Sequence, residues 1–391
     1  MKIRLKDAFD LQMGKTPARN TPAYWNGSYK WVSIADIGSA GKYITATKEG
    51  ITDKAITESG IRAVPAHTVI MSFKLSIGKT AITSEKMYTN EAIMAFVDNG
   101  TYDIDTNYLY HLCCGTRWTE GTNKAVMGLT LNKATLSEKR ISLPEITEQR
   151  NIAAKFDALD NVIEKTQAEL SSLDQLVKSR FVEMFGDPFH NPFGWKEIKI
   201  SEVLGGRVSN GYFAKREDYV ADGNVAVLGV ANVVNRMYSQ CAELPRTNAS
   251  LADIEKYRLQ YGDMLFCRSS LVAEGIGKAS IVPRTVQPNT LFECHVIRLP
   301  LNLNLCVPEY MQVLTTTEYF RQQILSQAKT ATMTTIGQEG ILKSLVLLPP
   351  LDLQQQFLSF IAEVDKSKLA VKQSLEKLET LKKSLMQQYF G

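Results

Sequence analysis

The sequence predicts an α+β fold made of two β-rich domains, each followed by one long helix. Three observations support this prediction. A segment of 44 residues occurs twice, each copy carries apolar residues at heptad spacing, and the segments between the copies consist of short β-rich runs. The chain is therefore expected to be a tandem duplication with four parts, which are 1–142, 143–186, 187–347 and 348–391.

The repeat is the clearest of these features. Residues 143–186 and 348–391 align without a gap at a constant offset of 205 (348 − 143), and eleven of the 44 aligned positions are identical. Both copies open on Leu-Pro and close on Phe-Gly. A chance match between two leucine-rich segments would share leucines, but it would not be expected to share both ends.

Each copy of the repeat is expected to form a long helix. Neither copy has a proline or glycine between its opening Leu-Pro region and its closing Phe-Gly, so each helix can run for ~35 residues, or roughly 50 Å. Apolar residues step by three and four along both copies, which is the pattern of a coiled-coil seam. The predicted seam residues are Phe156, Leu159, Ile163, Leu170, Leu173, Val177, Ile361, Val364, Val371, Leu375, Leu378 and Leu385.

Two helices in one chain that each carry such an apolar seam most simply pack on each other. The competing interpretation is that they are ordinary helices that each face a domain core. Lys368 and Lys382 occupy seam positions of the second copy, where a charged residue weakens packing but can fix register or partner choice.

The segments before the helices carry β-rich runs bounded by Gly, Pro and Asn, and their order corresponds. The run "AHTVIMSFKLSIGKTAIT" in the first resembles "YGDMLFCRSSLVAEGIGKASIV" in the second. Each has a turn, an apolar strand, a polar loop, a Gly-Lys pair and another strand. Two related β-rich domains are expected.

Composition excludes several classes of protein. The net charge of +4 is too small to indicate nucleic-acid binding by itself, and the N-terminal segment has no apolar stretch typical of a signal peptide. No apolar run approaches the ~18 residues of a membrane span. The six cysteines and four histidines show no metal-ligand spacing, which favours reduced thiols in a cytoplasmic protein without a metal.

The sequence shows no recognisable catalytic motif. The stretch "FVEMFGDPFHNPFGW", residues 181–195, resembles the Asp/Asn-Pro-Pro-aromatic tetrapeptide of DNA amino-methyltransferases, but "DPF" and "NPF" each have one proline instead of two. A glycine-rich cofactor loop in a strand–turn–helix context is also missing. Because Gly186 suits a helix stop and Pro188 forbids continuation, this stretch is interpreted as a domain boundary.

Basic and polar residues recur at matching places in the loops of both β-rich domains. Arg and Lys suit phosphates and guanine edges, so these residues are candidates for DNA contact, although any one of them could be a solvated surface charge. The predicted DNA-binding residues are Lys15, Arg19, Lys30, Ser72, Lys74, Lys79, Arg207, Lys215, Arg216, Arg268, Ser269 and Lys278.

Taken together, these features resemble the specificity subunit of Type I restriction–modification enzymes. The resemblance is carried by "MGKTPARNTPAYWNGSYKWVSIADI" (13–37), "VIMSFKLSIGKTAI" (69–82), the Leu-Pro and Phe-Gly ends of the two helices, and "MFGDPFHNPFGW" (184–195). It covers essentially the whole chain, and the four features are specific only in combination.

The resemblance implies two target-recognition domains related by pseudo-twofold symmetry and joined by an antiparallel coiled coil. Each would read one half of a split, asymmetric site on double-stranded DNA. Two modification subunits would carry S-adenosylmethionine and methylate adenine, and restriction subunits can join in phage defence. The specificity subunit itself would have no catalysis and no cofactor.

Two alternatives stay open at this point. The chain could be a coiled-coil scaffold whose domains bind protein, or a piece of a fused restriction–methylation enzyme, although the missing cofactor motifs disfavour the second. If the resemblance holds, the helical pair sets the distance between the half-sites, so its length should fix the number of unread bases.

Overall fold

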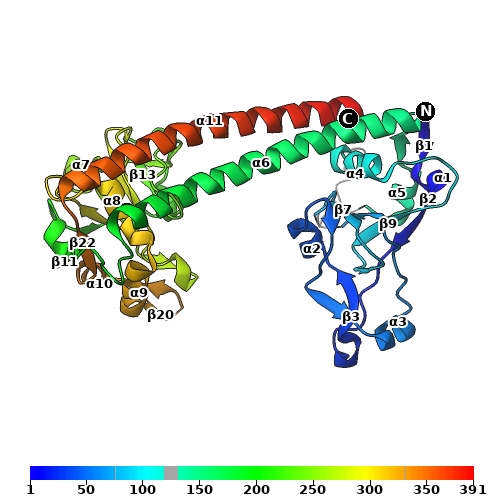
Figure 1. Ribbon diagram of the computed structural model, residues 1–391, viewed down its shortest axis with the longest axis horizontal. Helices are drawn as coiled ribbons and strands as arrows, with labels where there is room; N and C mark the ends of the chain where they lie inside the picture. Colours follow the sequence, from blue (N-terminus) through cyan, green and yellow to red (C-terminus); the bar gives the residue numbers. More distant parts are fainter. Residues whose placement is uncertain (75, 119–130, 331) are drawn as a thin grey trace. The chain divides into compact units, whose positions relative to one another are not determined.

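The computed structural model describes residues 1–74, 76–118, 131–330 and 332–391. The chain forms two compact units (Figure 1). Unit 1 contains residues 1–168 and 372–391, and unit 2 contains residues 169–371. Each unit therefore holds one β-rich domain together with parts of both long helices.

The described residues of unit 1 form three small sheets. The largest has the order β2-β9-β6-β7-β4, the second β5-β3-β8, and the third pairs β1 with β10. The strands are β1 (Lys2–Arg4), β2 (Phe9–Met13), β3 (Trp25–Val32), β4 (Tyr43–Ile44), β5 (Glu49–Ile51), β6 (Val69–Ser72), β7 (Thr80–Thr83), β8 (Tyr88–Thr89), β9 (Ile93–Asp98) and β10 (Arg140–Ser142). The short helices are α1 (Leu5–Ala8), α2 (Ile34–Ser39), α3 (Asp53–Ser59), α4 (Thr106–Gly115) and α5 (Lys133–Glu138), with the 3-10 turn η1 (Pro22–Tyr24).

The core of unit 1 lies between the central sheet and α4. Strand β6 is buried along its whole length because its sequence "VIMS" is apolar on both faces, and it pairs antiparallel with both β7 and β9. Helix α4 contacts β6 and β7, and the β3 sheet lies on the far side from the long helix (Figure 1).

Unit 2 repeats this plan. Its sheets have the orders β12-β19-β15-β17, β14-β13-β18, β16-β21-β20 and β11-β22. The strands are β11 (Lys196–Lys199), β12 (Ser209–Asn210), β13 (Val225–Leu228), β14 (Arg246–Thr247), β15 (Asp263–Cys267), β16 (Ser269–Ser270), β17 (Ala279–Ile281), β18 (Thr290–Phe292), β19 (Val296–Pro300), β20 (Lys329–Thr330), β21 (Thr334–Thr335) and β22 (Leu345–Leu348). The helices are α7 (Leu251–Tyr257), α8 (Pro308–Thr316), α9 (Glu318–Gln327) and α10 (Gln338–Leu342), with the 3-10 turns η2 (Ile200–Val203), η3 (Arg216–Asp218), η4 (Val230–Asn232) and η5 (Ala273–Gly275).

The long helices are α6 (Ile146–Phe185) and α11 (Leu351–Phe390), each of 40 residues. Their first and last residues differ by the offset of the sequence repeat. A buried glutamine braces the start of each helix. Gln149 donates to the carbonyls of Asp103 and Pro144, and Gln354 donates to those of Leu305 and Pro349. Such fully satisfied buried amides tie each helix to its own domain.

Within each unit, the parts of α6 and α11 pack antiparallel. In unit 1, Asp160 pairs with Lys382 at 2.5 Å and Phe156 contacts Phe390. In unit 2, Asp174 pairs with Lys368 at 2.7 Å. The two seam lysines are thus matched with aspartates of the facing helix, which specifies register at those points.

The predicted seam positions are the less exposed ones along both helices. Five are buried, namely Phe156, Leu159, Val177, Ile361 and Val364. The other seven are half-buried, namely Ile163, Leu170, Leu173, Val371, Leu375, Leu378 and Leu385.

Gly186 ends α6, as predicted. Its φ of +78° is the left-handed conformation that favours glycine, and an added Cβ would lie 2.4 Å from the ring of Pro192. Trp195 then donates from its indole nitrogen to the Phe185 carbonyl at 2.9 Å. The stretch 181–195 is a helix terminus with its cap, which agrees with its interpretation as a boundary.

Asp263 gives unit 2 a pH dependence that can be measured. This carboxyl at the start of β15 is 6% exposed and accepts one bond from the Gln260 amide. Burial raises its pKa to about 6 from an ordinary 3.8, against smaller lowering effects of that bond and of Arg298. The folded state therefore holds a proton that the unfolded state has lost between pH ~4 and ~6.

We expect the contribution of Asp263 to the free energy of unfolding to be fully present below pH ~4 and to decrease by about 3 kcal/mol as the pH rises through 6. Asp263→Asn should remove this part of the pH profile in urea unfolding monitored by circular dichroism. Asp222→Asn, at an exposed position of the same unit, is the control. An identical profile for wild type and Asp263→Asn would contradict the assignment.

Candidate nucleic-acid interface

Each unit presents a turn that is flanked by two of the predicted contact segments. In unit 1, the amides of Gly14 and Lys15 donate to the carbonyls of Ile93 and Thr89, and the Phe73 amide donates to Ala92. The segment at Lys15 and the segment at Lys74 therefore lie on either side of the turn 90–92.

Unit 2 has the same arrangement. The amides of Gly211 and Tyr212 donate to the carbonyls of Val296 and Phe292, and the Arg268 amide donates to His295 at 2.9 Å. The segment that carries Lys215 and Arg216 and the segment that carries Arg268 thus flank the turn 293–295. Two segments far apart in sequence are brought to one turn in both units.

Glycine is required where these segments cross. An added Cβ on Gly14 would lie 2.2 Å from the carbonyl oxygens of Thr89 and Asn90. An added Cβ on Gly211 would lie 2.2 Å from those of Phe292 and Glu293. Because a real Cβ cannot approach a backbone so closely, both positions depend on glycine.

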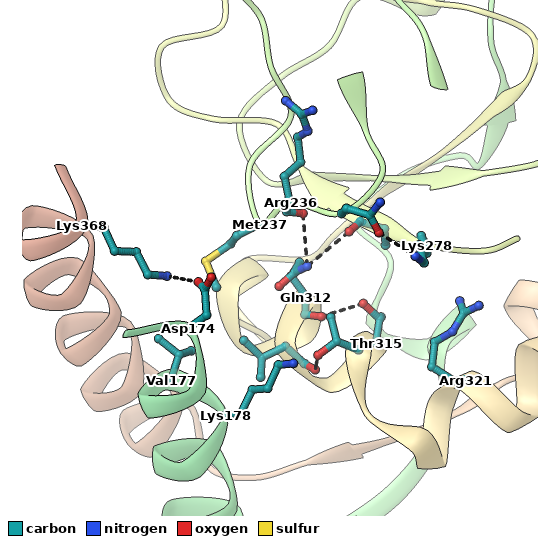
Figure 2. A pocket seen from close by; sticks show the side chains of 14 residues that line it. Asp174, Val177, Lys178, Arg236, Met237, Lys278, Gln312, Thr315, Arg321 and Lys368 are labelled. Carbon is teal, nitrogen blue, oxygen red and sulfur yellow. Dashed lines mark hydrogen bonds and ion pairs between the residues drawn. The ribbon is translucent and has the colours of Figure 1, made fainter. Parts of the chain in front are cut away.

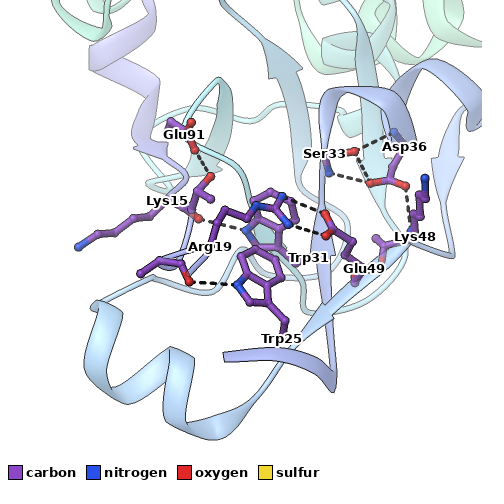
Figure 3. Close-up of polar contacts among 12 residues, drawn as sticks. Lys15, Arg19, Trp25, Trp31, Ser33, Asp36, Lys48, Glu49 and Glu91 are labelled. Carbon is purple, nitrogen blue, oxygen red and sulfur yellow. Dashed lines mark hydrogen bonds and ion pairs between the residues drawn. The ribbon is translucent and has the colours of Figure 1, made fainter. Parts of the chain in front are cut away.

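Arg19 is already engaged in unit 1 (Figure 3). Its guanidinium carbon lies 3.9 Å from the centre of the Trp25 ring and 4.9 Å from that of Trp31, and Nη2 donates to Glu49 at 3.0 Å. This bond raises the pKa of Arg19 and lowers the pKa of Glu49. The arginine therefore holds the loop in shape, and a DNA contact would have to compete with Glu49.

Lys15 and Lys30 differ in their availability. The Lys15 carbonyl accepts a bond from the Trp31 indole at 3.1 Å, while its exposed side chain extends away from that cluster (Figure 3). Lys30 is ion-paired with Glu85 and donates to the Thr45 carbonyl at 2.6 Å. Lys15 forms no ion pair with any described residue, whereas Lys30 supports the fold around β3.

The β6–β7 hairpin carries Ser72, Lys74 and Lys79. Ser72 is completely buried, and its hydroxyl accepts from the Lys79 amide at 3.1 Å. It braces the turn and does not enter the proposed contact surface, because a buried hydroxyl cannot reach DNA. Lys74 is half-buried with Nζ 5.3 Å from the Phe73 ring centre, and Lys79 is exposed.

In unit 2, Arg268 and Ser269 converge on the turn 293–295. Arg268 Nη1 donates to the Cys294 carbonyl at 3.2 Å, which leaves the other guanidinium donors directed elsewhere. The Ser269 hydroxyl lies 2.9 Å from His295 Nδ1. The cluster places the guanidinium N–H donors of Arg268 beside a polar turn. Paired donors of this kind suit hydrogen bonds to base edges.

The remaining predicted residues of unit 2 are surface cations. Arg207, Lys215 and Arg216 are exposed. Phe213, beside the last two, is 69% exposed. Lys278 is half-buried and donates from Nζ to the Asn235 side chain at 2.6 Å. Its side chain lines a pocket instead of the turn 293–295, although its backbone carbonyl accepts from the Cys267 amide, one residue before Arg268.

Leu271, Val272 and His295 lie beside the candidate contacts of unit 2 and were not among the predicted residues. The first two are 83% and 60% exposed in the loop that follows β16, next to Arg268 and Ser269. Apolar side chains beside hydrogen-bond donors suit contact with the methyl group of thymine. The signal was present, because "SSLVAEG" places two apolar residues in a loop bounded by Ser and Gly.

The chain is similar to known proteins along its length. Residues 1–175 match the family model of the Type I restriction modification DNA specificity domain. The MjaIX specificity subunit of Methanocaldococcus jannaschii is 26% identical over 251 residues, which cover 59% of this chain and 57% of that protein. The EcoKI specificity subunit of Escherichia coli is 24% identical over 279 residues, or 64% and 56% of the two chains.

Residues 1–175 of this chain therefore carry the Type I restriction modification DNA specificity domain. The chain spans a little over half the length of the two relatives just described. The MjaVIII specificity subunit of M. jannaschii matches along 98% of this chain and 90% of its own length at 21% identity. The resemblance seen in the sequence is thus confirmed.

A solved structure supports the fold along the whole chain. A chain from a study of complex assembly and conformational transition in a type I restriction–modification system superposes with a TM-score of 0.61. The superposition covers 100% of this chain and 97% of that chain at 17% identity. The predicted α+β fold, with two β-rich domains and two long helices packed together, is confirmed.

Two features are missing from the residues that the structure describes. No helix among them combines the length and apolarity of a membrane span. They also contain no group of three or more His, Cys, Asp or Glu side chains arranged to hold a metal ion.

Proposed function

We propose that this chain is the DNA-reading subunit of a Type I restriction–modification complex and that each unit reads one part of a split, asymmetric site. The observation that carries the proposal is the repeated turn. Both units place predicted contact segments on either side of it, but the side chains differ. Two domains with the same backbone arrangement and different contact side chains suit two half-sites of different sequence.

The partners follow from the same proposal. Two modification subunits would bind this chain, carry S-adenosylmethionine and methylate adenine, and restriction subunits could join them. This chain would contribute recognition and no catalysis, in the cytoplasm where the DNA lies. The competing proposal is a coiled-coil scaffold whose units bind protein.

One experiment separates the two proposals. The chain would be co-expressed with the modification subunits, purified as a complex, and tested for methylation of a DNA library followed by sequencing of the modified sites. A single split motif is the expected result. A stable complex that methylates without sequence preference would contradict DNA reading and favour the scaffold.

Arg268→Ala should relax recognition at one base pair. Its guanidinium is held at the turn by the Cys294 carbonyl and retains donors for a base edge. The expected loss of binding free energy is roughly 1–3 kcal/mol on the cognate site, with little loss on non-specific DNA.

Lys79→Ala should instead weaken binding to all DNA sequences evenly and flatten the salt dependence of binding, because an exposed lysine binds phosphate.

Fluorescence anisotropy with cognate and base-substituted duplexes at two salt concentrations makes both measurements. Arg150→Ala is the matched control, since this arginine on α6 has 68% of its side chain exposed and lies outside the predicted set. If Arg268→Ala behaves like Arg150→Ala, Arg268 does not belong to the reading surface.

A further inference from the structure

Unit 2 contains a pocket of about 470 Å³ whose lining carries an excess of positive charge. It is bounded by α6, α8, α9, α11 and the segment 235–237 (Figure 2). Asp174 is the single carboxylate among the lining side chains. The lining cations are Lys178, Arg236, Lys278, Arg321 and Lys368.

Two of these cations are neutralised or held elsewhere. Lys368 Nζ pairs with Asp174 at 2.7 Å, so that charge is balanced. The Arg236 guanidinium donates to the Val234 and Ala231 carbonyls and to Gln240, and it points away from Gln312 (Figure 2). The unbalanced positive charge of the pocket therefore belongs to the other three cations.

Those three lack a bonded carboxylate within the described part of unit 2. Lys278 donates to the neutral Asn235 side chain, and Lys178 is exposed on α6. Arg321 Nη2 donates to the Glu274 carbonyl at 3.2 Å, while its Nη1 is buried without a hydrogen-bond partner. A buried guanidinium nitrogen without an acceptor is costly, so the site is suited to an incoming oxyanion.

The electrostatics of Arg321 agree with this geometry. Burial lowers its pKa, and the nearby Glu318 carboxylate raises it by a smaller amount. The guanidinium stays charged in any case, because arginine is not deprotonated in proteins. A bound anion would recover the solvation that burial removes.

The corresponding pocket of unit 1 has the opposite character. The backbone carbonyls of Lys42 and Met237 accept from Ile82 and Ile281, which places the two pockets at equivalent points of the fold. In unit 1 the lining includes Asp157, Asp160 and Glu164. Its two lysines, Lys42 and Lys382, are already paired with the first two of these. Positive excess is thus a property of unit 2 alone in this comparison.

We propose that the pocket of unit 2 binds a phosphate group through Lys178, Lys278 and Arg321, and that this phosphate belongs to the DNA backbone. The choice of DNA rests on the proposed function, since Lys278 follows the same hairpin as Arg268. A free phosphate or nucleotide offers the same oxyanion chemistry and is distinguished by the test. The two half-sites would then contribute unequally to the salt dependence of binding.

The test uses the full chain in complex with its modification subunits. Lys178→Ala and Lys278→Ala would be titrated with cognate and non-specific duplexes from 50 to 200 mM salt. Each lost phosphate contact should reduce the slope of log K against log salt by ~0.9, equally for both duplexes. The methylated sequence should stay unchanged. Lys366→Ala is the control, because this exposed lysine of α11 pairs with Glu363 outside the pocket and should leave the slope unaltered.

A second arm measures the thermal stability of the isolated full chain with and without pyrophosphate. Loss of the pyrophosphate-induced shift in Lys178→Ala and Arg321→Gln, with unchanged DNA slopes, assigns the pocket to a free phosphate and overturns the DNA source. Unchanged slopes together with an unchanged shift overturn the phosphate site altogether. If the wild-type complex binds no DNA, the proposed function fails, and the pyrophosphate arm still decides the pocket.

Discussion

Phe185→Ala is expected to destabilise unit 2 by about 3–5 kcal/mol. Phe185 is 1% exposed at the end of α6, with ring centres 4.7 Å from Tyr310 and 5.4 Å from Phe357. Phe181 completes this aromatic cluster. Truncation leaves a cavity among rigid rings that cannot collapse to fill it, so the cost should lie at the upper end for a core residue.

Hydrogen exchange followed by mass spectrometry measures this effect for each unit. Protection of β15 and β19 in unit 2 should fall strongly, while β6 and β9 of unit 1 should keep theirs. Phe213→Ala is the matched control, since this phenylalanine is 69% exposed and its loss should change stability by less than about 0.5 kcal/mol. Equal loss of protection in both units would show that the cluster does not belong to unit 2 alone.

Removal of one heptad from each long helix should shorten the unread spacer of the DNA target without altering the half-sites. The antiparallel contacts identify 164–170 of α6 and 372–378 of α11 as a matched pair of segments. Seven helical residues span ~10.5 Å, which corresponds to roughly three base pairs of DNA. Methylation at the original sites should be lost and should appear at sites with the shorter spacer.

Sequencing of methylated genomic DNA gives the result directly. Deletion of 164–170 alone is the control, because it shifts the lysine–aspartate pairs out of register and should abolish methylation altogether. If the complex with the double-deletion variant still methylates the original sites, helix length does not set the spacer.

Much of the helical architecture could be predicted from the sequence. The repeat offset, the uninterrupted polar-apolar pattern and the Leu-Pro and Phe-Gly ends located α6 and α11 to within a few residues. These features are local, since heptad spacing and helix stops depend on neighbouring residues. The helices extend to 40 residues because the prolines at Pro144 and Pro350 precede their first turns and do not interrupt them.

The candidate interface was only partly predictable. Sequence spacing identified Lys15, Lys74 and Arg268 as exposed-loop candidates, but it could not distinguish them from Ser72, which is buried, or from Arg19 and Lys30, which are paired within the fold. The availability of Arg19 and Lys30 depends on Glu49 and Glu85, which lie 30 and 55 positions away, and no local sequence pattern encodes these contacts.

The sequence by itself determined that the chain is duplicated, that each copy ends in a long helix, and that it resembles the specificity subunits. The tertiary structure alone decided which parts belong together. Phe390 packs against Tyr108 and Phe156 in unit 1, and its counterpart Phe185 packs against Tyr310 in unit 2. The C-terminal end of α11 therefore belongs to unit 1, and the C-terminal end of α6 belongs to unit 2. This exchange follows because the two helices are antiparallel.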